Sequence, residues 1–135
     1  MPKPKTRNLL MVAAIAASLL LGAWPGRTQE QGEANVKNFT LVSVMVDETK
    51  IWLPSSIIVE QGDHVKLTLK NMIPGAGNQH GFALPGYGIT EVITAGTPKT
   101  VEFVASKPGV FTYYCQLHPA HIGGQLLVLH KMRSH

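Results

Sequence analysis

Hydrophobic and polar residues alternate over short stretches from Asn38 onward, which is the pattern of β-strands. The clearest stretch is His64–Lys70, where Val65, Leu67 and Leu69 alternate with polar residues, and this predicts a strand with one buried face. Other short apolar runs are separated by turn residues such as Gly, Pro and Asp. These runs lie at residues 39–46, 57–59, 92–93, 101–103, 110–114 and 125–129.

The chain is predicted to be all-β, because no stretch after Asn38 carries ten residues of helical periodicity. Seven or eight short strands separated by turns are typical of a β-sandwich with Greek-key connections. The length of 135 residues, with 13 Gly and 9 Pro, fits one small, turn-rich domain. We expect this domain to occupy residues 38–135, after a flexible leader at residues 29–37.

Residues 1–28 have the pattern of a targeting segment. Lys3, Lys5 and Arg7 precede an apolar stretch from Leu9 to Trp24, and a basic start followed by an apolar run is typical of a signal peptide. The stretch is shorter than the roughly 20 residues that span a bilayer, which favours a cleaved signal peptide; an uncleaved N-terminal anchor is the alternative. The sequence therefore predicts export to the periplasm or another compartment outside the cytoplasm.

The positive charge of the chain lies in its N-terminal segment. The formal net charge is +4, from 12 Lys and Arg against 8 Asp and Glu, and four of the bases precede the first acid, Glu30. The bases and acids after that point balance. A nucleic-acid-binding protein needs a basic face on its folded part, so the neutral domain argues against that partner.

Residue types that bind soft metal ions gather near the C-terminus, where Cys115, His118 and His121 lie within one short segment. They follow the strand predicted at 110–114, and the spacing of Cys115 and His118 lets one tight turn aim both side chains at one ion. His80 lies upstream, at the end of the Gly-rich loop predicted at 71–81. Thiolate and imidazole donors are preferred by copper and accepted by zinc. We therefore predict a metal site on these two loops.

Each of these residues also has a structural interpretation. A lone cysteine at a strand end is more often a small core residue, and a single loop histidine is more often solvated. The combination of the only cysteine with His118 and the upstream His80 favours metal binding over both. His64, His130 and His135 are interpreted as surface residues, and Met72 as a packing residue or an additional soft ligand.

Residues 38–130 resemble the cupredoxins, copper proteins built as Greek-key β-sandwiches. The resemblance rests on the turn Val59–Val65, on His80 and on the loop Tyr114–His118 before the last strand. Within that family, His80–Phe82 and Pro108–Gln116 are most similar to nitrosocyanin and to the copper domain of nitrous oxide reductase. The resemblance implies one copper ion with His80, Cys115 and His118 as equatorial ligands, and one-electron transfer with a cytochrome or a copper enzyme as redox partner.

Several positions differ from the family pattern. Pro119 stands four residues after Cys115, where a binuclear copper centre needs a second cysteine, so we expect a mononuclear site. Gly123 stands eight residues after the cysteine, where plastocyanin-like loops carry an axial methionine. His121 is the candidate fourth ligand, provided that the residues before it make a tight turn; water or a backbone carbonyl are the alternatives. Gly81 stands where blue-copper proteins usually have asparagine.

Two further functions are compatible with these residues. A copper carrier or copper-tolerance protein would use the same ligands but would exchange its ion through the histidine-rich loop at 118–124. A mononuclear copper enzyme would need an open coordination position and a substrate cavity, and the sequence offers no separate general acid or base. The protein is therefore predicted to be an electron carrier rather than an enzyme, with membrane contact only through an uncleaved N-terminus.

Overall fold

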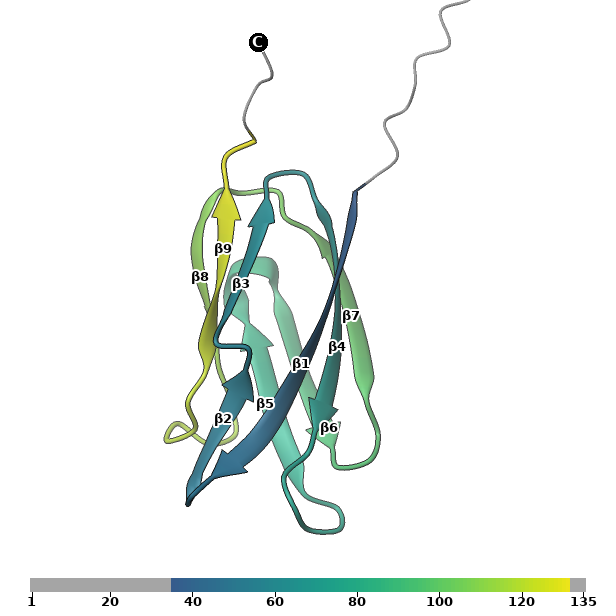
Figure 1. The fold of residues 1–135 in the computed structure, drawn as a ribbon, viewed down its shortest axis with the longest axis vertical. Coiled ribbons are helices and arrows are strands. Elements are labelled where there is room, and N and C mark those ends of the chain that lie inside the picture. Colours follow the sequence, from purple (N-terminus) through teal and green to yellow (C-terminus); the bar gives the residue numbers. More distant parts are fainter. Residues whose placement is uncertain (1–34, 132–135) are drawn as a thin grey trace, which may run out of the picture.

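A computed structural model describes residues 35–131, which form a sandwich of β-strands (Figure 1). Among these residues there is no α-helix, and no helix is long and apolar enough to cross a membrane. The strands, in chain order, are β1 (Val36–Val46), β2 (Thr49–Leu53), β3 (Ser56–Glu60), β4 (His64–Asn71), β5 (Gln79–Leu84), β6 (Ile89–Thr94), β7 (Lys99–Val104), β8 (Gly109–Tyr113) and β9 (Gly124–Leu129), with one 3-10 turn, η1 (Pro85–Tyr87), after β5.

The strands pair into two layers with crossovers between them. One sheet has the order β2-β1-β4-β7, in which β1 and β4 run parallel. The other contains β3-β9-β8, in which β3 and β9 run parallel. The hairpin β5–β6 continues this second sheet through an antiparallel bridge between Ala83 and Tyr114. The prediction of an all-β, Greek-key sandwich is confirmed.

The core lies between the two layers and follows the alternation seen in the sequence. In β4, Val65, Leu67 and Leu69 are buried, whereas Lys66 and Lys70 on the opposite face are exposed. Leu126 and Val128 of β9 are buried from the opposite layer. Each such side chain contributes about 1.5–3 kcal/mol of burial free energy, so the alternation fixes which face of each strand points inward.

The structure adds two strands that the hydrophobic pattern did not predict, which raises the number to nine among the described residues. β2 has one fully buried side chain, Trp52, and β5 is buried on both faces except at its first residue, so neither shows the alternation of a half-buried strand. β1 begins at Val36, inside the leader expected at 29–37. The signal peptide or anchor expected at 1–28 lies outside the described residues.

Asn71, at the end of β4, braces the loop that leads to β5. Its side chain is buried and makes four hydrogen bonds: Nδ2 donates to the carbonyls of Asn78 and Ile93 (3.0 and 3.1 Å), and Oδ1 accepts from Ser43 Oγ (3.1 Å) and the amide of Ile73 (3.0 Å). One side chain therefore ties β1, β6 and both ends of the loop together.

Replacing this brace is expected to destabilise the fold. Asn71→Ala leaves buried donors and acceptors without partners, and we expect the free energy of unfolding to fall by about 3 kcal/mol in a urea titration. Asn38→Ala, at an exposed position of β1, is the matched control and should change it by less than about 0.5 kcal/mol. Equal losses in the two variants would show that the brace is unimportant.

Candidate metal centre

Donor atoms from two parts of the chain converge at one end of the sandwich. His80 in β5, Cys115 directly after β8 and His121 before β9 each offer one ligand atom, and these atoms lie within 4.8 Å of one another. His80 and Cys115 are fully buried, and His121 is half-buried. The cluster can hold a single metal ion.

His80 does not lie on a loop, as the sequence analysis expected, but within β5. The glycine-rich turn ends before it, and His80 pairs with Ile93 in the ladder between β5 and β6. Its Nδ1 lies 3.1 Å from the carbonyl of Gly81, and because a carbonyl only accepts, Nδ1 carries the proton. Nε2 then has a free lone pair, yet this buried atom has no hydrogen-bond partner. Buried polar atoms are rarely left unpaired, so Nε2 is placed as a metal ligand would be.

The buried thiol of Cys115 lies against the backbone of Gly81, and Gly81 in turn packs against the side chain of Gln116. The amide of Gly81 donates a hydrogen bond to Sγ at 3.2 Å. A side chain at Gly81 would collide with Gln116, whose Nε2 donates to the carbonyl of Glu91 at 2.9 Å. Gln116 therefore occupies the space that an asparagine at position 81 would need, while the backbone still supplies the bond to sulfur.

The residues between the two C-terminal histidines form the tight turn on which the role of His121 depends. The amide of His121 donates to the carbonyl of His118 at 3.0 Å, with Pro119 and Ala120 at the two central positions. The ring of His121 stacks on His80, with centroids 4.7 Å apart and an angle of 8° between the planes. Its buried Nδ1 has no hydrogen-bond partner.

His118 lies beside this cluster at the surface. Its Nδ1 is 3.9 Å from Cys115 Sγ, and its ring stacks on His121 with centroids 4.5 Å apart. It is exposed, whereas the three clustered side chains are wholly or partly buried. All four predicted ligands thus lie close together. His121 belongs to the central group with His80 and Cys115, whereas His118, an equatorial ligand in the expected set, lies at the outer edge.

The pKa values of the two inner histidines are lowered, which favours the neutral form of both rings. Burial, reinforced by repulsion from His121 when that ring is protonated, lowers the pKa of His80 from 6.5 to about 4. Burial also lowers the pKa of His121, helped by the charges of His118 and Lys50. A metal ion binds the neutral imidazole, so both side chains are held in the form that coordination requires.

The structure explains why no methionine stands eight residues after the cysteine. A side chain at Gly123 would run into the carbonyl of Tyr113, so this position has no room for a thioether. Met72, considered above as an additional soft ligand, is 62% exposed at the end of β4. Among the described side chains, His118 lies beside the cluster, with Nδ1 3.9 Å from Cys115 Sγ, and is the candidate for a further ligand.

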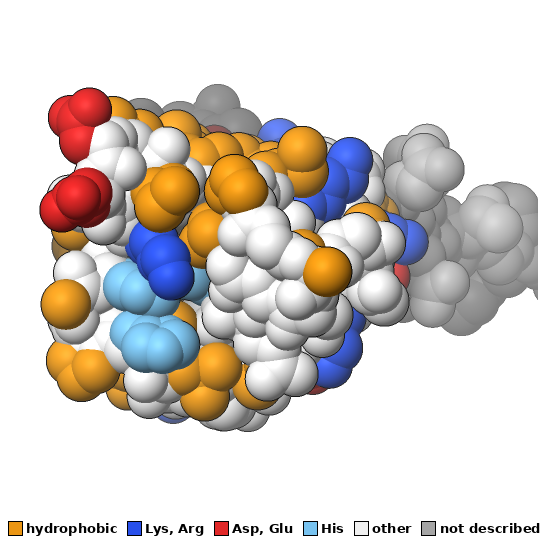
Figure 2. All heavy atoms as spheres, turned by 90° about the horizontal axis from the view of Figure 1, so that it is seen from below, with side chains coloured by type: hydrophobic (Ala, Val, Ile, Leu, Met, Phe, Trp, Pro, Cys, Tyr) orange, Lys and Arg blue, Asp and Glu red, His pale blue; other side chains and the backbone are white. Residues whose placement is uncertain are grey.

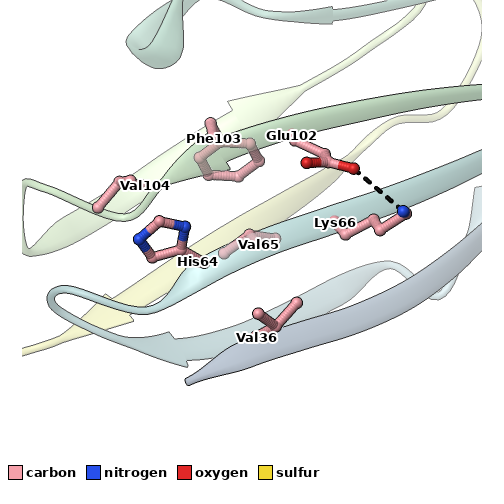
Figure 3. Close-up of a pocket in the computed structure, with 7 residues that line it drawn as sticks. All are labelled: Val36, His64, Val65, Lys66, Glu102, Phe103 and Val104. Atoms are coloured by element: carbon pink, nitrogen blue, oxygen red, sulfur yellow. Dashed lines mark ion pairs between the residues drawn. The ribbon is translucent and has the colours of Figure 1, made fainter. Parts of the chain in front are cut away.

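A cavity of about 270 Å³ lies elsewhere, on the outer face of β1, β4 and β7 (Figure 3). His64 lines it beside Phe103 and the ion pair between Lys66 and Glu102, whose Nζ and Oε1 are 3.1 Å apart. It contains one histidine and no cysteine, and His64 is exposed there, as the sequence analysis expected. This cavity is unsuited to a soft metal ion.

Sequence reasoning missed two side chains that shape the site. Trp52 of β2 packs edge-on against His80, with ring centroids 4.9 Å apart, and its Nε1 donates to the carbonyl of Gly81 at 2.9 Å. The second is Gln116, whose side chain packs against Gly81 and which appears in the sequence only as a neighbour of Cys115. The sequence offered one signal for Trp52, a tryptophan in a segment to which no strand was assigned. The contact between its indole and His80 depends on long-range strand pairing, which a single sequence does not show.

Among curated proteins, the chain is similar to nitrous-oxide reductases. It is 38% identical to that of Cupriavidus necator over 66 residues, which are 47% of this chain and 10% of the relative. The enzyme of Stutzerimonas stutzeri is 35% identical over 66 residues, with the same shares. The aligned region is thus about a tenth of the length of these relatives.

Solved structures of copper proteins share the fold. Copper nitrite reductase from Nitrosomonas europaea superposes with a TM-score of 0.63 at 24% identity, covering 72% of this chain and 42% of that one. Auracyanin from Roseiflexus castenholzii gives 0.55 at 17% identity, covering 67% of this chain and 95% of that one. These likenesses support the sandwich architecture.

The sequence profile of the cupredoxin-like domain family matches residues 11–128. The donor cluster fits this match, because a thiolate with imidazole nitrogens is the ligand set that copper prefers in such proteins. The predictions of a cupredoxin fold and of one copper ion as cofactor are confirmed at this level, and the chain belongs to the cupredoxin-like domain family.

Proposed function

We propose that this protein transfers single electrons through one copper ion held by Cys115, His80 and His121, with His118 at the outer edge of the site. The observation that carries the proposal is the convergence of a buried thiol with two buried imidazole nitrogens that have no hydrogen-bond partner. Copper bound by thiolate and imidazole cycles between Cu(I) and Cu(II) with little change in geometry.

The surrounding residues hold the ligands in place during such a cycle. The indole of Trp52 packs against His80, and Gly81 donates its amide to the sulfur of Cys115. Both residues belong to strands of the sandwich, and the indole of Trp52 is buried. Fixed ligands need little rearrangement when one electron arrives or leaves, which favours fast transfer.

The export and partner predictions belong to this proposal. The basic and apolar pattern at residues 1–28 supports passage into the periplasm, where a cytochrome or a copper enzyme would be the redox partner. The relatives named above are nitrous-oxide reductases, so a role beside an enzyme of nitrogen-oxide reduction is one setting for such a carrier.

A second function, copper carriage, is favoured by the position of His118. This side chain is exposed on the turn that leads to His121, so an acceptor could reach the site from solvent. The two functions differ in how fast the ion leaves. Slow copper release to a chelator with rapid oxidation and reduction by a cytochrome would support electron transfer, and rapid release with slow cycling would support carriage.

Removal of the thiolate should abolish the colour of the copper-loaded protein. Cys115→Ser keeps a small side chain that can accept the hydrogen bond from Gly81, but it cannot give a thiolate-to-copper charge-transfer band. We expect the strong visible absorption to disappear while the circular dichroism of the sandwich is retained. His64→Gln, at an exposed position far from the cluster, is the control and should keep the band. Persistence of the band in Cys115→Ser would refute thiolate ligation.

The copper-free protein should lose stability in mild acid. The pKa of His80 is lowered from 6.5 to about 4 in the folded protein. Between these two pH values His80 is therefore protonated in the unfolded chain but neutral in the folded one, which favours unfolding. From pH 7 to pH 5 this difference should cost about 2 kcal/mol of unfolding free energy, measured by urea titration with a chelator present. His80→Gln should remove most of this dependence. An unchanged slope in that variant would mean that His80 is readily protonated in the folded state.

His121→Met tests whether the central histidine is a ligand. A thioether binds copper more weakly than imidazole and favours Cu(I), so the reduction potential should rise and the spectrum should move towards that of an ordinary blue site. His130→Met, an exposed residue after β9, is the matched control and should leave both unchanged. Identical EPR parameters in wild type and His121→Met would remove His121 from the ligand set.

A further inference from the structure

Lys50 lies on the face of β2 that points towards the metal cluster. In the ladder between β1 and β2, Trp52 pairs with Ser43, and both are buried on the inner face. Lys50 is two residues before Trp52, so its side chain leaves the strand on the same face. Trp52 contacts His80, so Lys50 lies on the strand face that carries this contact, nearer the start of β2.

The backbone fixes Lys50 next to the histidine turn as well. The amide of Ile122 donates to the carbonyl of Lys50 at 2.9 Å, and the amide of Trp52 donates to the carbonyl of Ile122 at 3.0 Å. Ile122 directly follows His121. Figure 2 shows a basic side chain lying against the histidine side chains at this end of the molecule, and the charge of Lys50 contributes to lowering the pKa of both His80 and His121.

The ammonium group of Lys50 has no carboxylate partner among the described residues. The ion pairs there join Lys66 to Glu102 and Lys99 to Glu91. Asp47 and Glu48, in the turn between β1 and β2, carry the nearest acids in sequence, and both are exposed. The half-buried Lys50 therefore brings an uncompensated positive charge to the mouth of the site.

We propose that Lys50 raises the reduction potential of the copper site by disfavouring its oxidised form. The inference rests on the proposed function. One thiolate with neutral imidazoles leaves a net charge of +1 with Cu(II) and zero with Cu(I), so a neighbouring ammonium repels the oxidised site more strongly. Reduction adds one electron from the redox partner and moves no proton. The lysine opposes the preference for Cu(II) that a third imidazole ligand would bring.

The test compares the affinities of purified variants for Cu(I) and Cu(II), each measured by competition with a chelator. Lys50→Gln and Lys50→Met remove the charge, and both should lower the ratio of the Cu(I) to the Cu(II) association constant by about five-fold. The midpoint potential should fall in parallel. Lys50→Arg keeps the charge and should preserve the ratio. Lys107→Gln, at an exposed site before β8, is the matched control and should also preserve it.

The outcomes separate this inference from the proposed function. If the wild type binds copper with a thiolate band, but the ratio in Lys50→Gln and Lys50→Met stays within about two-fold of that in Lys50→Arg, the role of Lys50 is refuted and the copper site stands. If the wild type binds neither Cu(I) nor Cu(II), both are refuted. An equal fall in Lys107→Gln would assign the effect to overall charge and would also overturn the proposal.

Discussion

The metal centre depends on one pair of backbone hydrogen bonds that join β5 to the end of β8. The amide of Ala83 donates to the carbonyl of Tyr114 at 2.8 Å, and the amide of Tyr114 donates back to Ala83 at 3.0 Å. This bridge sets residues far apart in sequence side by side, so the amide of Gly81 reaches the sulfur of Cys115. His80, one residue earlier, is carried to the same end of the sandwich. The short turn from His118 to His121 then adds the imidazole of His121 to the two donors that the strands already hold together.

The same pairing explains the unusual residues around the site. Gln116 fills the space beside Gly81, and Gly123 passes too close to the backbone of Tyr113 to carry a side chain. A site of this shape has no place for a methionine after the ligand loop. The tight turn instead brings the ring of His121 onto that of His80. The candidate ligand cluster and the close packing of the loop therefore occur together at this end of the sandwich.

The sequence was sufficient for the fold class and for the residues that gather at the site. Alternation in β4 and the turn residues between strands are local signals, and Cys115, His118 and His121 are close in the chain. The strand that contains His80 was missed, because a segment buried on both faces shows no alternation. The roles of Trp52 and Lys50 depend on the register of β1 with β2 and on hydrogen bonds to Ile122. Such long-range pairings leave no local pattern in a single sequence.

The proposed function requires one copper ion held by one thiolate and by imidazoles of this cluster. X-ray absorption at the copper edge of the loaded protein, combined with a copper count per chain, tests it most directly because it reports the ligand atoms themselves. We expect one copper per chain, with a single sulfur ligand and two or three imidazole nitrogens. A first coordination shell without sulfur, or a copper–copper interaction, would contradict it.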